Sequence, residues 1–423
     1  MYNYGITCKH NFKFELDIKK GCLSGKSSIN DGVQTLPYNM VPMLTTIDNK
    51  LRIKITDAKH EIDKNYKNGY WDYAKTLTNP YELIFSGSKK FVGKNIKYVR
   101  NSVCDYNPLS RSFFKMIEMS GTFLLPILTK AKGIQTLHLA EGPGGFIEGI
   151  CHMRKKLVNN TAIQNLDTYY GMTLIDTDRQ IDTGFDIPSW KKSTQFLRQN
   201  NNVIITAGHD GTGNLYHKCN IQYIKDRFGN KMDIVTADGG FDFSVDYNSQ
   251  EYLAGRLIFC EILSALVALK PGGTFICKFF DIINKLTVDF LYILQCKFKY
   301  IYIYKPKTSR LANSEKYIVC VNYTGELTSN ELEQLFSVVD IFTTLSSGDS
   351  IIENSKYTFL DGILTNVPAN FTKFISTISE SIIDKQVENI KTTLGIIQKH
   401  RKGGLTCTTI DTIIQKQRID ALR

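Results

Sequence analysis

Long apolar runs are missing from this 423-residue sequence, although 42% of its residues are hydrophobic. A helix that spans a bilayer needs about 20 consecutive apolar residues, so the sequence predicts no transmembrane segment. Residues 1–5 also lack the charged and apolar regions of a secretory signal peptide, which favours a protein that is not secreted. The composition is that of an ordinary globular protein, and the length predicts more than one domain.

Closely paired cysteines are missing as well. The ten cysteines are spread along the chain without a CxxC pair. Their spacing matches neither a zinc site nor a disulfide framework. We therefore expect reduced cysteines in the core and no bound metal.

Two glycine-rich nucleotide motifs are incomplete. Ser24-Gly25-Lys26-Ser27 resembles the end of a phosphate-binding P-loop, but that motif needs glycine at position 20, which is Lys20 here. The glycines at 142, 144 and 145 do not have the spacing of the dinucleotide fingerprint. The sequence thus offers no P-loop, and it disfavours a nicotinamide-dependent oxidoreductase.

Positive charge is in excess. The chain carries 52 basic and 41 acidic residues, a formal net charge of +11. This favours a polyanionic partner, most simply nucleic acid, over a protein that is merely basic. Basic residues recur between positions 89 and 115. The candidate RNA contacts are Lys89, Lys90, Lys94, Arg111 and Arg310.

The centre of the chain alternates between apolar strands and helical patterns. An apolar run at 137–140 leads into a turn of three glycines and a proline, and then into a helix in which the first residue is Phe146. Further strands are predicted at 169–174, 202–206, 232–237 and 273–279, with helices between them. This predicts an α/β fold with a mostly parallel sheet covered on both faces. Predicted strands 299–304 and 315–321 are close in sequence, so we expect them to pair antiparallel.

Three regions follow from this pattern. Residues 1–95 form an N-terminal extension of mixed character. Residues 96–325 hold the alternating strands and helices. Residues 326–423 are mostly helical, with a long amphipathic helix and a basic tail that starts at His400. We expect this last region to be an appendage without a catalytic role.

Polar residues stand where the predicted strands end. Asp238 follows strand 232–237, Lys278 lies within an apolar strand, and Glu315 opens the last strand. Ligands of open parallel sheets bind beyond the carboxyl ends of the strands. Each residue alone could be a solvated loop charge, but a buried lysine needs a carboxylate, and Asp238 is the natural partner of Lys278.

Four motifs occur together in a recognisable order: Ser110-Arg111-Ser112-Phe113-Phe114-Lys115, Glu141-Gly142-Pro143-Gly144-Gly145-Phe146, Thr236-Ala237-Asp238-Gly239-Gly240, and Lys305-Pro306-Lys307-Thr308-Ser309-Arg310 with Asn313-Ser314-Glu315-Lys316-Tyr317. In these motifs, residues 100–325 resemble the FtsJ-like family of S-adenosylmethionine-dependent RNA 2′-O-methyltransferases, especially its Adrift-type cap branch. The resemblance implies a Rossmann-like class I methyltransferase fold. Ser112 is a candidate cap for the helix in the first motif.

The resemblance also implies a set of site residues. The family's Lys-Asp-Lys-Glu catalytic tetrad falls on Lys115, Asp238, Lys278 and Glu315, with Lys278 holding the 2′-oxygen as a base or as a positioning group. The cofactor S-adenosylmethionine is expected at the turn of Glu141, Gly142, Pro143, Gly144, Gly145 and Phe146, with Glu141 near its ammonium, and at Asp238. A carboxylate is expected at the adenosine, and Asp210 is preferred over Asp176.

Substrate and setting are further implications. The cap branch implies methylation of the first transcribed nucleotide of capped mRNA. Methylation of another structured RNA, or a catalytically silent RNA-binding subunit of a capping complex, are the alternatives. As a whole the chain resembles a viral methyltransferase, which implies a viral capping machinery in the host cytoplasm, with packaging in the virion left open.

Overall fold

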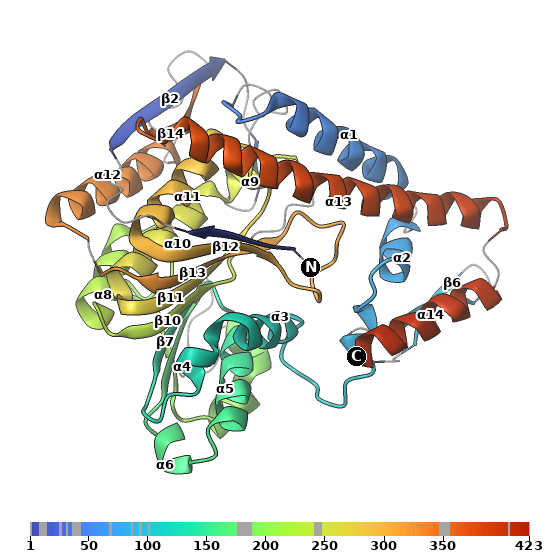
Figure 1. Ribbon diagram of the computed structural model, residues 1–423, viewed down its shortest axis with the longest axis horizontal. Helices are drawn as coiled ribbons and strands as arrows, with labels where there is room; N and C mark the ends of the chain where they lie inside the picture. The colour runs from blue at the N-terminus through green and yellow to red at the C-terminus, as the bar shows by residue number, and fades with distance from the viewer. Residues whose placement is uncertain are drawn as a thin grey trace.

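The central sheet organises the described part of the chain. The computed structural model describes residues 2–7, 15–24, 28–30, 33–35, 44–66, 70–85, 88–92, 95–99, 102–175, 188–240, 248–325, 327–346, 356–404 and 407–422. Eight strands pair in the order β1-β12-β13-β11-β10-β7-β8-β9 (Figure 1). They are β1 (Tyr2–Thr7), β7 (Gln135–Leu139), β8 (Thr168–Met172), β9 (Val203–Thr206), β10 (Met232–Ala237), β11 (Leu269–Phe279), β12 (Phe298–Lys305) and β13 (Lys316–Tyr323).

The directions of the strands agree with the sequence pattern. Strands β11, β10, β7, β8 and β9 pair parallel along their shared edges. Strand β13 pairs antiparallel with both β11 and β12, as their closeness in sequence predicted. The expected α/β fold with a mostly parallel sheet is confirmed. The sequence did not predict β1, which adds a further antiparallel strand at the edge beside β12.

Helices cover both faces of the sheet. Figure 1 shows α3, α4 and α5 on one side and α10 and α11 on the other. One apolar core lies between the sheet and α8, α10 and α11, and a second lies against α3, α4 and α5. The central helices are α3 (Ser112–Met119), α4 (Leu125–Leu128), α5 (Gly145–Leu157), α6 (Thr161–Gln164), α7 (Thr194–Gln199), α8 (Lys218–Phe228), α9 (Gln250–Leu253), α10 (Gly255–Ala268) and α11 (Lys285–Lys297).

Shorter segments complete the central region. A π-helical turn at Ser120–Leu124 joins α3 to α4, and a 3-10 helix spans Pro188–Ser193. The expected single helix 250–269 is divided at Ala254 into α9 and α10.

The segments before and after the central region pack together. Helix α13 (Ala369–Arg401) contacts both α1 (Asn49–Tyr66) and α2 (Tyr70–Leu77), and strands β2 (Leu16–Ser24) and β14 (Lys356–Leu364) form a two-stranded sheet. A third apolar cluster joins α1, α2 and α13. Figure 1 shows α13 crossing the molecule beside α1. The remaining elements are β3 (Ser28–Asn30), β4 (Val33–Thr35), a 3-10 helix (Glu82–Ile84), β5 (Ser88–Val92), β6 (Asn95–Val99), α12 (Ser329–Ser346) and α14 (Cys407–Leu422).

Within the described ranges, no helix is both long enough and apolar enough to span a bilayer.

A buried ion pair ties the start of β7 to α5. Arg154 is 0% exposed, and its Nε lies 3.0 Å from Oδ2 of Asp167. The same guanidinium donates to the backbone oxygens of Leu128, Lys130 and Lys132. Asp167 in turn accepts from the backbone N–H of Ile134. The pair therefore orients the strand and the helix that flank the glycine turn.

Replacing this arginine should destabilise the whole domain. In an Arg154→Leu variant, Asp167 is left buried without its cation, and we expect the free energy of unfolding to fall by about 3–5 kcal/mol. Urea denaturation measures the change. Lys156→Leu, an exposed substitution on the same helix, is the matched control and should change stability by less than about 0.5 kcal/mol. A loss below about 1 kcal/mol for Arg154→Leu would contradict this role.

Candidate active site

Four charged side chains meet at one end of the sheet. Lys115 comes from α3, Asp238 directly follows β10, Lys278 lies on β11, and Glu315 directly precedes β13. The parallel register of β10 with β11 and the antiparallel register of β11 with β13 set these positions. The structure therefore brings together all four members of the predicted tetrad.

The four side chains form two ion pairs. Nζ of Lys115 lies 2.8 Å from Oε1 of Glu315, and Nζ of Lys278 lies 3.2 Å from Oδ1 of Asp238. Lys278 also donates to the backbone oxygen of Asp238 at 2.7 Å. The exposed fractions of the four side chains lie between 11% and 17%, so the site is largely buried but still open to solvent.

Tyr317 and Ser112 link the tetrad and were not predicted as site residues. The Tyr317 hydroxyl donates to Oδ1 of Asp238 at 2.8 Å and accepts from Nζ of Lys115 at 3.4 Å. Tyr317 is the cross-strand partner of Lys278 and stands two residues after Glu315 in the sequence. Residues two apart share a face of a strand. In the predicted strand 315–321, Tyr317 therefore shares a face with Glu315, and this spacing could have identified it as a site residue.

Ser112 does not cap α3 as expected. The helix has no side-chain cap, and the Ser112 hydroxyl instead donates to Oδ2 of Asp238 at 2.8 Å. The prediction was wrong because a local capping pattern cannot show a carboxylate that lies 126 residues away.

The charges set the protonation states of the site. Burial alone would lower the pKa of Lys278, but the carboxylates of Asp238 and Glu315 outweigh it and raise that pKa. Burial alone would raise the pKa of Glu315, but Lys115 and Lys278 lower it to about 2. Lys278 is therefore an ammonium and Glu315 a carboxylate in this state of the protein.

Two buried lysines hold the backbone of the loop 306–315, which carries Glu315. Lys305 donates to the backbone oxygens of Asn313 and Glu315, and Lys316 donates to those of Phe280 and Ser314. Burial lowers the pKa of Lys305 to about 7 and that of Lys316 to about 8.

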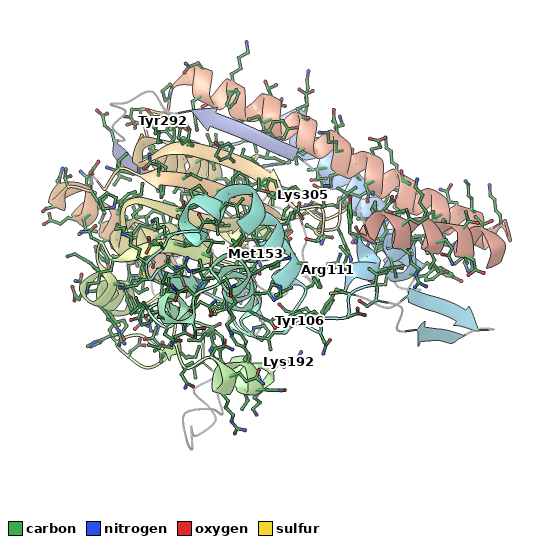
Figure 2. The ribbon with its side chains drawn as sticks, turned by 60° about the horizontal axis from the view of Figure 1, so that its bottom comes forward. Tyr106, Arg111, Met153, Lys192, Tyr292 and Lys305 are labelled. Carbon is green, nitrogen blue, oxygen red and sulfur yellow. The ribbon has the colours of Figure 1, made fainter. Side chains whose placement is uncertain are left out.

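The two arginines predicted to bind RNA are already bonded within the protein. Arg310 donates to both carboxylate oxygens of Glu82, and Nη1 of Arg111 lies 3.2 Å from Oε2 of Glu82. Arg111, labelled in Figure 2, also donates to the backbone oxygen of Thr308. Burial alone would raise the pKa of Glu82, but the guanidinium groups lower it to about 2. Both arginines thus fasten the N-terminal extension to the loop 306–315.

The lysines predicted to bind RNA lie at the limit of what the structure describes. Lys89 and Lys90 are on β5, where only the backbone is described, and Lys94 lies outside the described residues. Their contact with RNA stays a prediction.

The glycine turn stands between β7 and α5, as predicted. Gly144 has a φ of +104°, and a β-carbon there would lie 3.1 Å from the ring of Trp190. A β-carbon on Gly145 would collide with the Ser110 hydroxyl at 2.2 Å. The backbone of this turn is therefore bare because its surroundings leave no room for side chains. Ser193 donates to the backbone oxygen of Pro143, a contact that no sequence motif predicted.

Glu141 has one engaged and one open carboxylate oxygen. Oε1 accepts from the backbone N–H groups of Phe146 and Ile147 at the start of α5. Oε2 is buried and has no hydrogen-bond partner among the described residues. Burial and the nearby Asp238 carboxylate raise the pKa of Glu141 well above its usual value. A buried carboxylate oxygen beside bare backbone fits the ammonium of S-adenosylmethionine.

The predicted adenosine contact has a structural role of its own. Asp210 lies in the loop after β9, where Oδ1 accepts from Thr212 and Asn220 and Oδ2 accepts from His217. Its role at the adenosine stays a prediction. The second candidate, Asp176, lies outside the described residues.

The chain is similar in sequence to two curated mRNA methyltransferases. The chain is 34% identical over 215 residues to cap-specific mRNA (nucleoside-2′-O-)-methyltransferase 2 of Drosophila melanogaster, which covers 48% of this chain and 28% of that protein. It is 31% identical over 277 residues to cap-specific mRNA (nucleoside-2′-O-)-methyltransferase 1 of Mus musculus, which covers 63% and 30%. The matches thus span less than a third of these curated relatives.

The chain also resembles solved methyltransferase structures and one family model. A ribosomal RNA methyltransferase of Plasmodium falciparum aligns with 51% of this chain and 99% of its own, at 20% identity and a TM-score of 0.33. The model of the family described as FtsJ-like methyltransferase matches residues 108–323, which include the whole tetrad and the glycine turn. Since this match covers half of the chain, the protein belongs to the FtsJ-like methyltransferase family.

Proposed function

We propose that this protein is an S-adenosylmethionine-dependent RNA 2′-O-ribose methyltransferase that acts on the first transcribed nucleotide of capped mRNA. The observation that carries the proposal is the buried pairing of Lys115 with Glu315 and of Lys278 with Asp238. Membership of the FtsJ-like family and the cap-specific names of the relatives support it. The viral setting in the host cytoplasm rests on the resemblance of the whole chain alone.

Lys278 is the group best placed to handle the ribose hydroxyl. A 2′-hydroxyl is a weak nucleophile and must give up its proton as the new bond forms. The carboxylates raise the pKa of Lys278, so its resting ammonium orients the hydroxyl by donating a hydrogen bond to the oxygen. Proton acceptance requires that pKa to fall, and a cation bound beside Lys278 would favour this.

The other residues of the site orient Lys278 and hold the cofactor. S-adenosylmethionine supplies a methyl group that is already activated on sulfur, so in-line positioning is most of the work. Asp238 fixes the orientation of Lys278 through its carboxylate and its backbone oxygen. Glu141 offers Oε2 to the ammonium of the cofactor. The backbone of the turn 142–145 would hold its methionine part.

Substrate choice separates the proposal from its alternative. Methylation of another structured RNA would use the same tetrad and differ only in how the RNA docks. We expect methyl transfer to short RNAs to be faster with a methylguanosine cap than without one, and the label to map to the first transcribed nucleotide. Equal rates on capped and uncapped RNA, or a label elsewhere, would favour the alternative. An absence of transfer to any RNA would favour a silent binding subunit.

Removing Lys278 should abolish turnover but not cofactor binding. We expect Lys278→Ala to lower the single-turnover rate by roughly 100-fold or more, because positioning and proton handling are both lost. Arginine should not restore activity, since it is larger and stays charged. Lys156→Ala, an exposed substitution on α5, is the control and should keep the rate. A folded Lys278→Ala protein with near wild-type turnover would remove the tetrad assignment.

Glu141 should make cofactor affinity depend on pH. We expect Glu141→Gln to weaken S-adenosylmethionine binding by about 10- to 100-fold, the value of a charge-assisted hydrogen bond. The pKa of Glu141 is raised, so its ionised form is lost as pH falls, beginning above the usual range of a glutamate. Wild-type affinity should therefore decrease on acidification, while the affinity of the variant stays flat.

Titration calorimetry between about pH 5 and 8 measures both affinities, and a thermal melt confirms folding. Wild-type and Glu141→Gln proteins with the same affinity and the same pH dependence would show that Glu141 serves only to cap α5.

A further inference from the structure

A cavity opens directly beside the tetrad, and half of its wall comes from outside the methyltransferase family match. Its volume is about 290 Å³. Glu315 and Asn313 of the loop 306–315 line one side. Ile62 of α1, Trp71 of α2 and Gln386 of α13 line the other. The N-terminal and C-terminal segments therefore reach the active site and are more than an appendage.

The wall is built into the fold through buried contacts. Lys59 of α1 is 8% exposed, and its Nζ lies 2.7 Å from Oδ2 of Asp281. Gln386 is 2% exposed and donates through Nε2 to the backbone oxygen of Ala312 at 3.1 Å. The first contact holds α1 against the segment that follows β11, and the second holds α13 against the loop that carries Glu315. The shape of the cavity is thus set by the same loop that sets the tetrad.

The cations around the cavity are already neutralised. Lys59 pairs with Asp281, Lys75 pairs with Asp72, and Arg310 pairs with Glu82. A bare phosphate would have to compete with these carboxylates, so the cavity is a poor phosphate site.

What remains in the lining suits a flat, polar heteroaromatic ring. Trp71 and Ile62 supply apolar surface, and the amide of Asn313 lies on the opposite side. Gln250 and Gln386 each use one amide atom within the protein, since Oε1 of Gln250 accepts from Ser314 and Nε2 of Gln386 donates to Ala312. Nε2 of Gln250 and Oε1 of Gln386 are the amide atoms that remain for a ligand. Ligand pockets range from about 300 to 1,000 Å³, so a cavity of about 290 Å³ holds one ring system and not a run of bases. Aromatic side chains with polar neighbours are the usual means of holding a single unpaired base.

We propose that this cavity binds one nucleobase of the RNA, from the nucleotide next to the one that is methylated. Glu315 belongs both to the cavity wall and to the tetrad, so its occupant and the reacting ribose are neighbours along the strand. The inference rests on the proposed function and extends it. The base is that of the cap guanosine on the 5′ side or of the following nucleotide on the 3′ side, and both present a flat heteroaromatic ring with polar edges.

Filling the cavity from its outer wall tests the proposal. In Ile62→Trp, the larger ring occupies the space of the base, and KM for capped RNA should rise about tenfold or more, in keeping with about 1–3 kcal/mol per stacked base. The dissociation constant of S-adenosylmethionine should not change. Asp63→Trp, at an exposed position of the same wall, gives a second variant whose folding is not at risk. Ile53→Trp is the control, because Ile53 lies on the same helix and is 61% exposed.

Two RNA series identify the source of the base. In one, the 5′ end carries methylguanosine or only a triphosphate; in the other, the nucleotide after the acceptor is normal or abasic. Where the filled variants lose the preference for the cap, the base is the cap guanosine. Where they lose the preference for an intact base after the acceptor, it is the 3′ base. Unchanged KM for every RNA in both folded variants would overturn the inference. Wild-type protein without methyl transfer would instead overturn the proposed function.

Discussion

The balance of buried charge at the ends of β10 and β11 is the constraint on which the site depends. Two ammonium groups and two carboxylates lie there with little exposure to water, and the Tyr317 hydroxyl joins the two ion pairs. Removing one member of a buried pair leaves an uncompensated charge, which costs more than the pair contributes. Each charge is therefore needed to hold the others, and this keeps Lys278 oriented by Asp238.

Charged side chains also hold the loop 306–315, which carries Glu315. Lys305 donates to the backbone oxygen of Glu315 and Lys316 to that of Ser314. Glu82 binds Arg310 of the loop and Arg111, which contacts the loop from outside. Glu82 belongs to the N-terminal extension, and Gln386 of the C-terminal helix reaches the loop from another direction. The position of Glu315 thus depends on three separate parts of the chain.

This arrangement changes how the flanking regions are understood. The sequence pattern divides the chain into regions 1–95, 96–325 and 326–423, and only the middle region carries the family motifs. In the fold, β1 joins the central sheet, and α1 and α2 pack on α13. The loop 306–315, which carries Glu315, is therefore held partly by segments outside the family match, since Glu82 and Gln386 both bind it or its arginines.

The sequence by itself determined the class of fold and the position of the glycine turn, and its resemblance to a family singled out the four charged residues that the structure brings together. Apolar strands that alternate with helices form a parallel sheet covered on both faces. A lysine buried inside an apolar strand needs a carboxylate partner. Tertiary structure alone decided that Ser112 binds Asp238, that Arg111 and Arg310 bind Glu82, and that Gln386 reaches Ala312. These partners are 29 to 228 residues apart, and no local periodicity records which polar groups will meet once the helices and strands pack.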